Sequence, residues 1–390
     1  FFTITKQYLE HTIKANKRSD NLYHSYNLMT IENDTEVSVS YLPEMLEGQV
    51  AVLSAEYLSS KEVLAVLDAM KASALFRKDQ YSYILYPNKE LARFDEKNVI
   101  SKTSVANSKL LSQLVSDGNT QIINQDVTGK YHFNANFNNS NRLKEAFAEL
   151  PEAYEDLLEK EAQLLLTIFE EVFNHKAFTG RSGTFFGYEG LGSIYWHMLS
   201  KLLLSVQENC LIAVKNNEDQ ALIGRLFDHY YEIQAGVGVH KSPQLYGAFP
   251  TDPYSHTPGG KGAQQPGMTG QVKEDVLSRI GELGVFVKEG KLNFSPKLLR
   301  ENEFITTPQT FKYTAISKEE KTINLKEGSL CFTYCQIPII YSLSEKEGIE
   351  VVFNDASKTI FNSLSLDVKT STKVFSRSNE INHIEVSISK

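Results

Sequence analysis

The feature that most constrains the fold is a change in hydrophobic period near residue 285. Before it, apolar residues recur every three or four positions, which is the period of an amphipathic helix. From about Phe304 onward, β-branched and aromatic residues alternate with polar ones in short runs divided by Gly, Asn and Asp. The sequence therefore predicts a mainly α chain with a β-rich C-terminal part. We expect a helical domain over residues 1–290 and an antiparallel β-sandwich over residues 291–390.

The helical part contains several separate patterns. Ser59 and Glu62 have the spacing of a capping box, Pro151 suits a first helical position, and Gly118 is placed to stop a helix. Hairpins are expected over residues 120–134 and 285–296. Loops of mixed length favour paired helices that close into a toroid. The predicted helices cover residues 4–13, 42–53, 59–73, 104–117, 151–174, 194–206, 218–233 and 271–283.

Composition excludes some classes of function. The net charge of −8 has no basic block, which argues against nucleic acid as the partner, and no apolar run reaches the roughly 18 residues of a membrane span. We expect a soluble protein, with a cytoplasmic and a periplasmic location both open.

Cys331 and Cys335 are expected on one face of a strand as small core residues. Because the chain opens at Phe1 on a helical pattern, we expect sequence missing upstream.

The stretch from Gly236 to Val272 has neither helical nor strand periodicity, yet it is rich in Gly, Pro, Tyr, His and Gln. A loop this long is usually functional or disordered, and disordered segments are poor in aromatic residues. We interpret it as an ordered loop that bears a site. Asp252 precedes Pro253 and is either a turn residue or a chemical group. The Gly259-Gly260-Lys261 run is either an anion cradle or a surface turn.

A second candidate segment contains Glu189 between two glycines, next to Tyr188 and before a helix with Trp196. Glu189 either complements the dipole of that helix or serves as the acid of a sugar site. Trp196 either packs in the core or lines a sugar subsite. His197 is interpreted as a buried or interhelical histidine. The glycine spacing does not match a dinucleotide fingerprint.

Near the N-terminus, Glu44 and Glu47 are expected three residues apart on one helical face. His24, Tyr26 and Asn27 precede them in a polar, aromatic loop. These residues either line the same cavity as the other candidates or begin a solvated helix.

Several strong motifs are missing from the sequence. It contains no HExxH, no cysteine cluster and no GxSxG elbow, so we expect no metal and no cofactor. Carboxylates, amides and aromatic rings around glycine-rich loops instead fit a polyhydroxylated ligand. The expected partner is an oligosaccharide or polysaccharide, with inorganic phosphate as a second candidate ligand.

Three segments resemble bacterial six-hairpin glycosidases and cellobiose-phosphorylase-like proteins: YLPEMLEGQVAVLS, GYEGLGSIYWHMLSKLL and YGAFPTDPYSHTPGGKGAQQPGMTGQV. The resemblance implies an (α/α)6 barrel with β-sandwich domains, and cleavage of glycosidic bonds with inversion by water or phosphate. It also implies that His256, Thr257 and Gly259 are of the types that bind phosphate. The Asp-Trp-Asn-Asp-like motif of such phosphorylases is missing here. The acid therefore lies upstream of Phe1, or another carboxylate replaces it, or the activity is lost.

The resulting hypothesis is a carbohydrate-active enzyme that cleaves a glycosidic bond with inversion, by hydrolysis or phosphorolysis. Inverting hydrolysis needs two carboxyl groups about 6.5–9.5 Å apart, and we assign Glu189 as the acid and Asp252 as the base or positioning group. The alternatives are a polysaccharide lyase, with Tyr254 and His256 as base and acid, and a non-catalytic glycan-binding protein. The predicted subsite residues are Tyr188, Trp196, Tyr254, His256 and Gln265, and the predicted phosphate ligands are Thr257, Gly259 and Lys261.

Overall fold

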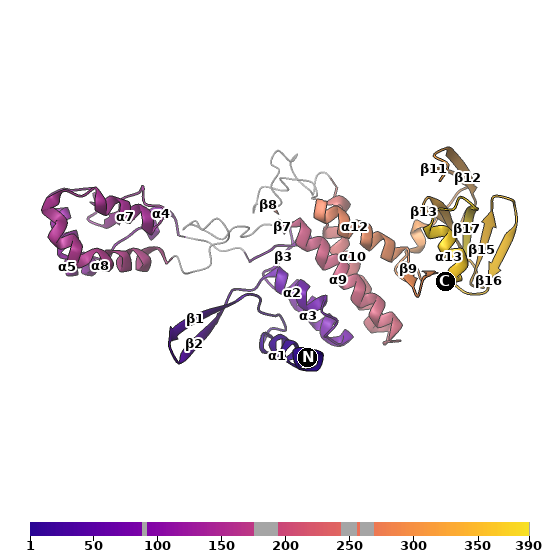
Figure 1. The fold of residues 1–390 in the computed structure, drawn as a ribbon, viewed down its shortest axis with the longest axis horizontal. Helices are drawn as coiled ribbons and strands as arrows, with labels where there is room; N and C mark the ends of the chain where they lie inside the picture. Colours follow the sequence, from indigo (N-terminus) through magenta and orange to yellow (C-terminus); the bar gives the residue numbers. More distant parts are fainter. Residues whose placement is uncertain (88–91, 175–193, 243–255, 258–268, 390) are drawn as a thin grey trace. The chain divides into compact units, whose positions relative to one another are not determined.

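The computed structural model describes residues 1–87, 92–174, 194–242, 256–257 and 269–389 (Figure 1). Only the backbone is described at 28, 239, 256–257 and 269–272. The chain divides into two compact units that alternate along the sequence. The first comprises Phe1–Tyr57, Ala65–Leu199 and Ala235–Gly267, and the second comprises Leu58–Leu64, Ser200–Gln234 and Met268–Lys390. The toroid, the sandwich and the division at residue 290 stay predictions.

The N-terminal elements begin with the predicted first helix, which is confirmed as α1. The second helix starts at Leu46, four residues later than expected, because Pro43 disfavours helical backbone at Leu42 and Met45 is extended. The capping box of α3 is confirmed, since Ser59 and Glu62 exchange hydrogen bonds. In order, the elements are α1 (Phe2–Ala15), β1 (Asn27–Asn33), β2 (Glu36–Tyr41), α2 (Leu46–Leu53), α3 (Ser60–Ala72), β3 (Phe76–Arg77) and β4 (Ser82–Tyr83).

Residues 92–174 form a small α-helical module with one hairpin. The helix expected over 104–117 is broken at Ser108, whose hydroxyl caps a second helix by accepting from the Leu111 N–H at 3.1 Å. Gly118, at φ +68°, ends that helix as predicted. Pro151 precedes a 3-10 turn instead of opening the long helix. The elements are α4 (Phe94–Lys97), α5 (Lys102–Asn107), α6 (Lys109–Ser116), β5 (Ile123–Gln125), β6 (Tyr131–Phe133), α7 (Ser140–Ala148), η1 (Glu152–Tyr154) and α8 (Glu155–Phe173).

This module has a hydrophobic core of its own, drawn from residues 100–173. The ring of Phe169 lies at its centre, with ring centroids 5.0 Å from Phe133 and 4.7 Å from Phe173. Aromatic rings packed at these distances contribute beyond their buried area. The module is therefore held together by local contacts.

Three longer helices follow, α9 (Trp196–Lys215), α10 (Gln220–Gly236) and α12 (Thr269–Glu282), with the 3-10 turn η2 (Gly238–His240) after α10. In the second unit, buried polar groups link all three helices. The Tyr230 hydroxyl donates to the Glu282 carboxylate at 2.7 Å and accepts from the Gln207 amide at 3.0 Å. That amide also donates to the Ser278 carbonyl at 2.7 Å. A paired network of this kind fixes the register of the helices.

The C-terminal part contains one five-stranded sheet in the order β13-β14-β17-β15-β16, in which β14 and β17 run parallel and the other neighbours antiparallel. Three two-stranded or helical pieces accompany it: the β9–β10 hairpin, the β11–β12 hairpin and α13. The bounds are β9 (Val285–Lys288), β10 (Lys291–Phe294), η3 (Glu301–Glu303), β11 (Gln309–Thr314), β12 (Glu320–Leu325), β13 (Ser329–Tyr334), β14 (Ile337–Leu343), β15 (Gly348–Phe353), β16 (Lys358–Phe361), α13 (Val368–Phe375) and β17 (Ile381–Ile388).

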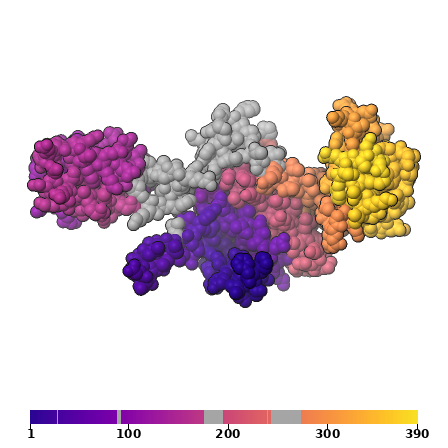
Figure 2. Space-filling model, viewed as in Figure 1, coloured from indigo at the N-terminus to yellow at the C-terminus, as the bar shows by residue number. Residues whose placement is uncertain are grey.

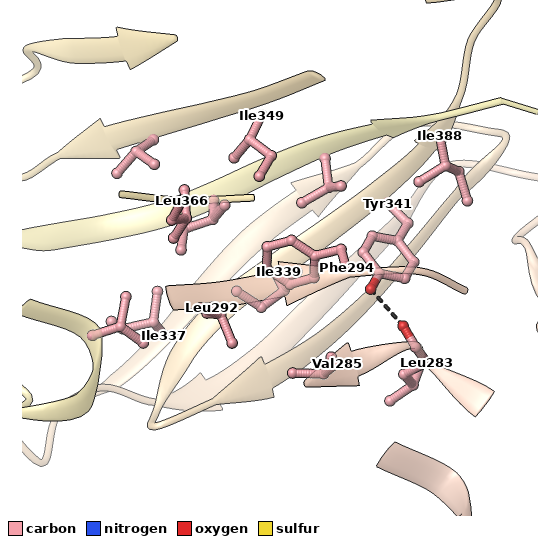
Figure 3. Packing of buried hydrophobic residues seen from close by; sticks show 14 of the residues in the cluster. Leu283, Val285, Leu292, Phe294, Ile337, Ile339, Tyr341, Ile349, Leu366 and Ile388 are labelled. Atoms are coloured by element: carbon pink, nitrogen blue, oxygen red, sulfur yellow. Dashed lines mark hydrogen bonds between the residues drawn. The ribbon is translucent and has the colours of Figure 1, made fainter. Parts of the chain in front are cut away.

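Tyr341 anchors the core of this sheet. Its ring is fully buried between Phe294 and Phe332, and its hydroxyl donates to the Leu283 carbonyl at 2.5 Å (Figure 3). The expectation that both cysteines lie on one face of a strand as core residues is wrong. Cys331 lies on β13, whereas Cys335 lies in the following tight turn at φ +49°, and both are only half-buried.

Candidate functional site

The candidate site is built around a short strand pair between two distant segments. Ile194 and Tyr195 form β7, His256 and Thr257 form β8, and the two strands are antiparallel with Tyr195 opposite His256. β7 directly follows the glycine-rich segment that contains Glu189, and β8 belongs to the 236–272 loop. The structure thus brings the backbones of the two candidate segments together at this point.

Trp196 begins α9 immediately after β7 and is 1% exposed. The ammonium of Lys241 lies 5.1 Å from the centroid of its ring, which is within the range of a cation–π contact. In the described structure the indole is packed in the core, which is one of the two roles expected from the sequence. A contact between this ring and a sugar stays a prediction.

Lys241 is half-buried at the end of η2, where its ammonium donates to the side-chain carbonyl of Gln80 at 3.3 Å. Burial, assisted by the nearby Arg77 guanidinium, lowers the pKa of Lys241 to about 8, while Asp79 opposes the shift. The hydrogen bond from Arg77, at 2.5 Å, in turn lowers the pKa of the Asp79 carboxyl. Lys241 is therefore mostly cationic at neutral pH. A bound anion near its ammonium would raise the pKa of Lys241 further toward the ordinary value.

The end of α10 fixes this arrangement. The Ser82 hydroxyl donates to the carbonyl of Gly236 at 3.1 Å. A Cβ at Gly236 would lie 2.1 Å from the Tyr81 carbonyl oxygen, so only glycine allows this approach. The β3–β4 turn, which carries Gln80, is thereby held against the start of the 236–272 loop.

Sequence reasoning missed Lys241 as a site residue. No sequence pattern marks this lysine, because its contact with Gln80 and its place beside Arg77 and Asp79 depend on the fold. The catalytic assignments and most subsite assignments fall outside the part of the chain that the structure describes: Glu189, Asp252, Tyr188, Tyr254, Gln265, Gly259 and Lys261. For His256 and Thr257 the structure gives only their place in β8.

A second cluster lies at the base of the β1–β2 hairpin. The Tyr26 hydroxyl donates to the Glu47 carboxylate at 2.8 Å, and the His24 and Tyr41 rings stack with centroids 4.2 Å apart. The expectation that Glu44 and Glu47 share a helical face is wrong, because α2 begins after Glu44. Glu44 instead pairs with Arg18 at 3.2 Å.

Neither a metal centre nor a membrane-spanning helix is present among the residue ranges that the structure describes. No group of three or more His, Cys, Asp or Glu residues there is arranged to hold a metal ion. No helix in those ranges combines the length and apolar character needed to cross a membrane.

Comparison with known proteins gives one finding. Residues 91–176 match the family described as GH149 phosphorylase insertion domain 2. The matched range coincides with the module from α4 to α8, which has its own core. No curated protein matches the chain. The match supports a relation to glycoside phosphorylases, and through them to carbohydrate metabolism.

Proposed function

We propose that the protein is an inverting glycoside phosphorylase that acts on a neutral oligosaccharide. The observation that carries the proposal is the match of residues 91–176 to a phosphorylase insertion domain. The segments on either side of that module contain the carboxylates and aromatic residues that such chemistry needs. Phosphorolysis is favoured over hydrolysis because the matched domain is that of phosphorylases.

The reaction breaks the bond between the anomeric carbon and the glycosidic oxygen. A phosphate oxygen attacks the anomeric carbon from the opposite face, and a carboxylic acid donates its proton to the leaving oxygen. The products are a sugar 1-phosphate of inverted anomeric configuration and a shortened sugar. One protein carboxyl group is enough, because phosphate replaces the water that a second carboxylate would activate.

In this scheme Glu189 is the proton donor, and Asp252 positions the substrate or phosphate. Tyr188, Tyr254 and Gln265 shape the sugar subsites. Thr257, Gly259 and Lys261 form the phosphate cradle, next to His256. The β7–β8 pair supports this grouping, since it joins the segment after Glu189 to the loop that contains the cradle. We add Lys241, the half-buried cation beside β7, as a source of positive charge for phosphate.

Product analysis tests the proposal. The protein is incubated with neutral oligosaccharides, with and without inorganic phosphate, and products are separated by chromatography. We expect a sugar 1-phosphate that forms only when phosphate is present. Free reducing sugar formed without phosphate would instead indicate a hydrolase. A uronate-containing oligosaccharide tested in parallel would give an ultraviolet-absorbing unsaturated product if the protein were a lyase. Binding without any product would indicate a glycan-binding protein.

A further inference from the structure

We propose that the base of the β1–β2 hairpin is a second binding platform for a neutral oligosaccharide, formed by Tyr26, Tyr41 and Glu47. The class of ligand rests on the proposed function, but the platform involves other residues than the β7–β8 site. In the space-filling view the hairpin forms a projecting arm (Figure 2). The platform lies where this arm joins α2.

Two aromatic rings are exposed at this place. Tyr26 is 61% exposed and Tyr41 is 50% exposed, although tyrosine is a residue type of intermediate burial. Tyr41 stacks on the His24 imidazole with an angle of 20° between the ring planes, so one face of the tyrosine is fixed. A fixed, half-exposed ring suits stacking against the apolar face of a sugar, because little conformational entropy is lost on binding.

The segment that precedes Tyr26 is attached to α2 by hydrogen bonds. The Gln49 side chain accepts from the Tyr23 N–H at 2.9 Å and donates to the Tyr23 carbonyl at 2.8 Å. A Cβ at Gly48 would lie 2.9 Å from the Ser25 side chain, so α2 and this segment are in direct contact. Tyr26 has φ +53°, a conformation that is costly for a tyrosine and persists where surrounding contacts impose it. The backbone at Tyr26 is therefore held in place before a ligand binds, and stacking on His24 orients the Tyr41 ring.

One polar group next to the rings is available to the hydroxyl groups of a sugar. The Glu47 carboxylate accepts one hydrogen bond from Tyr26, and within the described residues it forms no ion pair. A carboxylate oxygen can accept more than one hydrogen bond, so Glu47 can also accept from a ligand.

The local charge favours a neutral ligand. Asp20 and Glu44 both pair with the guanidinium of Arg18, so this cation is already neutralised. The negative charge of Glu47 is then not compensated by Arg18. A phosphorylated or uronate ligand would meet net negative charge here and be repelled. A neutral sugar offers hydroxyl donors to Glu47 and an apolar face to the tyrosines.

Isothermal titration calorimetry in phosphate-free buffer tests the platform without turnover. The probes are cello-, laminari- and malto-oligosaccharides of increasing length. For those that bind, we expect Tyr41→Ala to weaken affinity at least tenfold and Tyr41→Phe to retain it, since the ring makes the contact. Glu47→Gln is expected to weaken affinity as well. The control is Tyr8→Ala on α1, a more exposed tyrosine at 71%, which is expected to bind like the natural chain.

The outcomes separate this inference from the proposed function. Full affinity in both Tyr41→Ala and Glu47→Gln, or no binding of any probe by the natural chain, overturns the platform. If Tyr41→Ala shows no melting transition, that variant is unfolded, and the affinity of Glu47→Gln alone tests the platform. If the chain forms a sugar 1-phosphate and the substitutions at Tyr41 and Glu47 leave its affinity unchanged, the proposed function holds and the platform is overturned. If those substitutions weaken binding but no sugar 1-phosphate forms, the platform holds and the proposed function is overturned.

Discussion

At the scale of single residues, Lys241 is the best-defined member of the candidate site. Its ammonium lies over Trp196 and contacts Gln80, both far away in sequence. No local pattern marks this lysine, because its burial arises only when three separate segments meet. The sequence showed aromatic and carboxylate candidates in glycine-rich loops. It did not show which residues contact them.

The pH dependence of stability tests the environment of Lys241. Its pKa of about 8 in the folded chain lies below the roughly 10.4 of an unfolded lysine. Between these values the unfolded state binds the extra proton, so stability rises with pH across that window. We expect the melting temperature of the natural chain to rise relative to that of Lys241→Met from pH 8 to pH 10. The exposed Lys215→Met is the control, and parallel curves for the natural chain and Lys241→Met would refute the burial.

Glu189→Gln tests the proton donor assigned from sequence. Removing a general acid is expected to lower kcat by about 10²-fold to 10⁴-fold, while the melting temperature stays unchanged. Steady-state kinetics with oligosaccharide and phosphate measure the effect. The control is Glu345→Gln, an exposed carboxylate of the C-terminal part. Unchanged turnover in Glu189→Gln would show that another residue donates the proton.

At the scale of elements, the sequence predicted the longer helices and the β-rich C-terminal part, because their hydrophobic periods are clear. It missed the β1–β2 hairpin, the short β3–β4 pair, α4, α7 and α13. It ended α9 near residue 206, whereas the helix continues to Lys215. Gln207 and Asn209 look like loop residues, yet both are buried, and Gln207 bonds to groups of α10 and α12. Tertiary partners of this kind override local propensity. The break at Ser108 was missed for a related reason, since that hydroxyl also donates to Glu161 of α8 at 2.7 Å.

Two glycines of α10 offer a matched test of how that helix holds the site. Gly236→Ala places a Cβ against the Tyr81 carbonyl, and we expect it to destabilise the chain by about 1–3 kcal/mol. Gly224→Ala meets nothing within 4 Å, and higher helix propensity should stabilise it by up to about 1 kcal/mol. Urea unfolding measures both. Equal effects of the two substitutions would contradict the close contact at Gly236.

At the scale of the whole molecule, the chain consists of parts with separate cores. Among the described residues, the buried core of the α4–α8 module is drawn from residues 100–173, and that of the C-terminal sheet from residues 283–388. The sequence predicted the change from helices to strands but not the module, because its helices have the same period as their neighbours. Its separate hydrophobic core and the family match distinguish it.

Independent cores predict independent unfolding. Phe169→Ala removes the central ring of the module, and we expect a loss of about 3–5 kcal/mol there. Hydrogen exchange should then show faster exchange across residues 92–174 and unchanged protection of the β13–β17 strands. Leu164→Ala, an exposed position on the same helix, serves as the control. Equal loss of protection in both regions would mean that the module and the sheet unfold together.

The central claim is that phosphate, and not water, attacks the anomeric carbon. The most direct measurement is a nuclear magnetic resonance time course, with phosphorus and proton detection, of the protein with an oligosaccharide that it cleaves and inorganic phosphate. The account predicts a sugar 1-phosphate whose anomeric configuration is opposite to that of the cleaved bond. Retained configuration, or a reducing sugar formed with no consumption of phosphate, would contradict it.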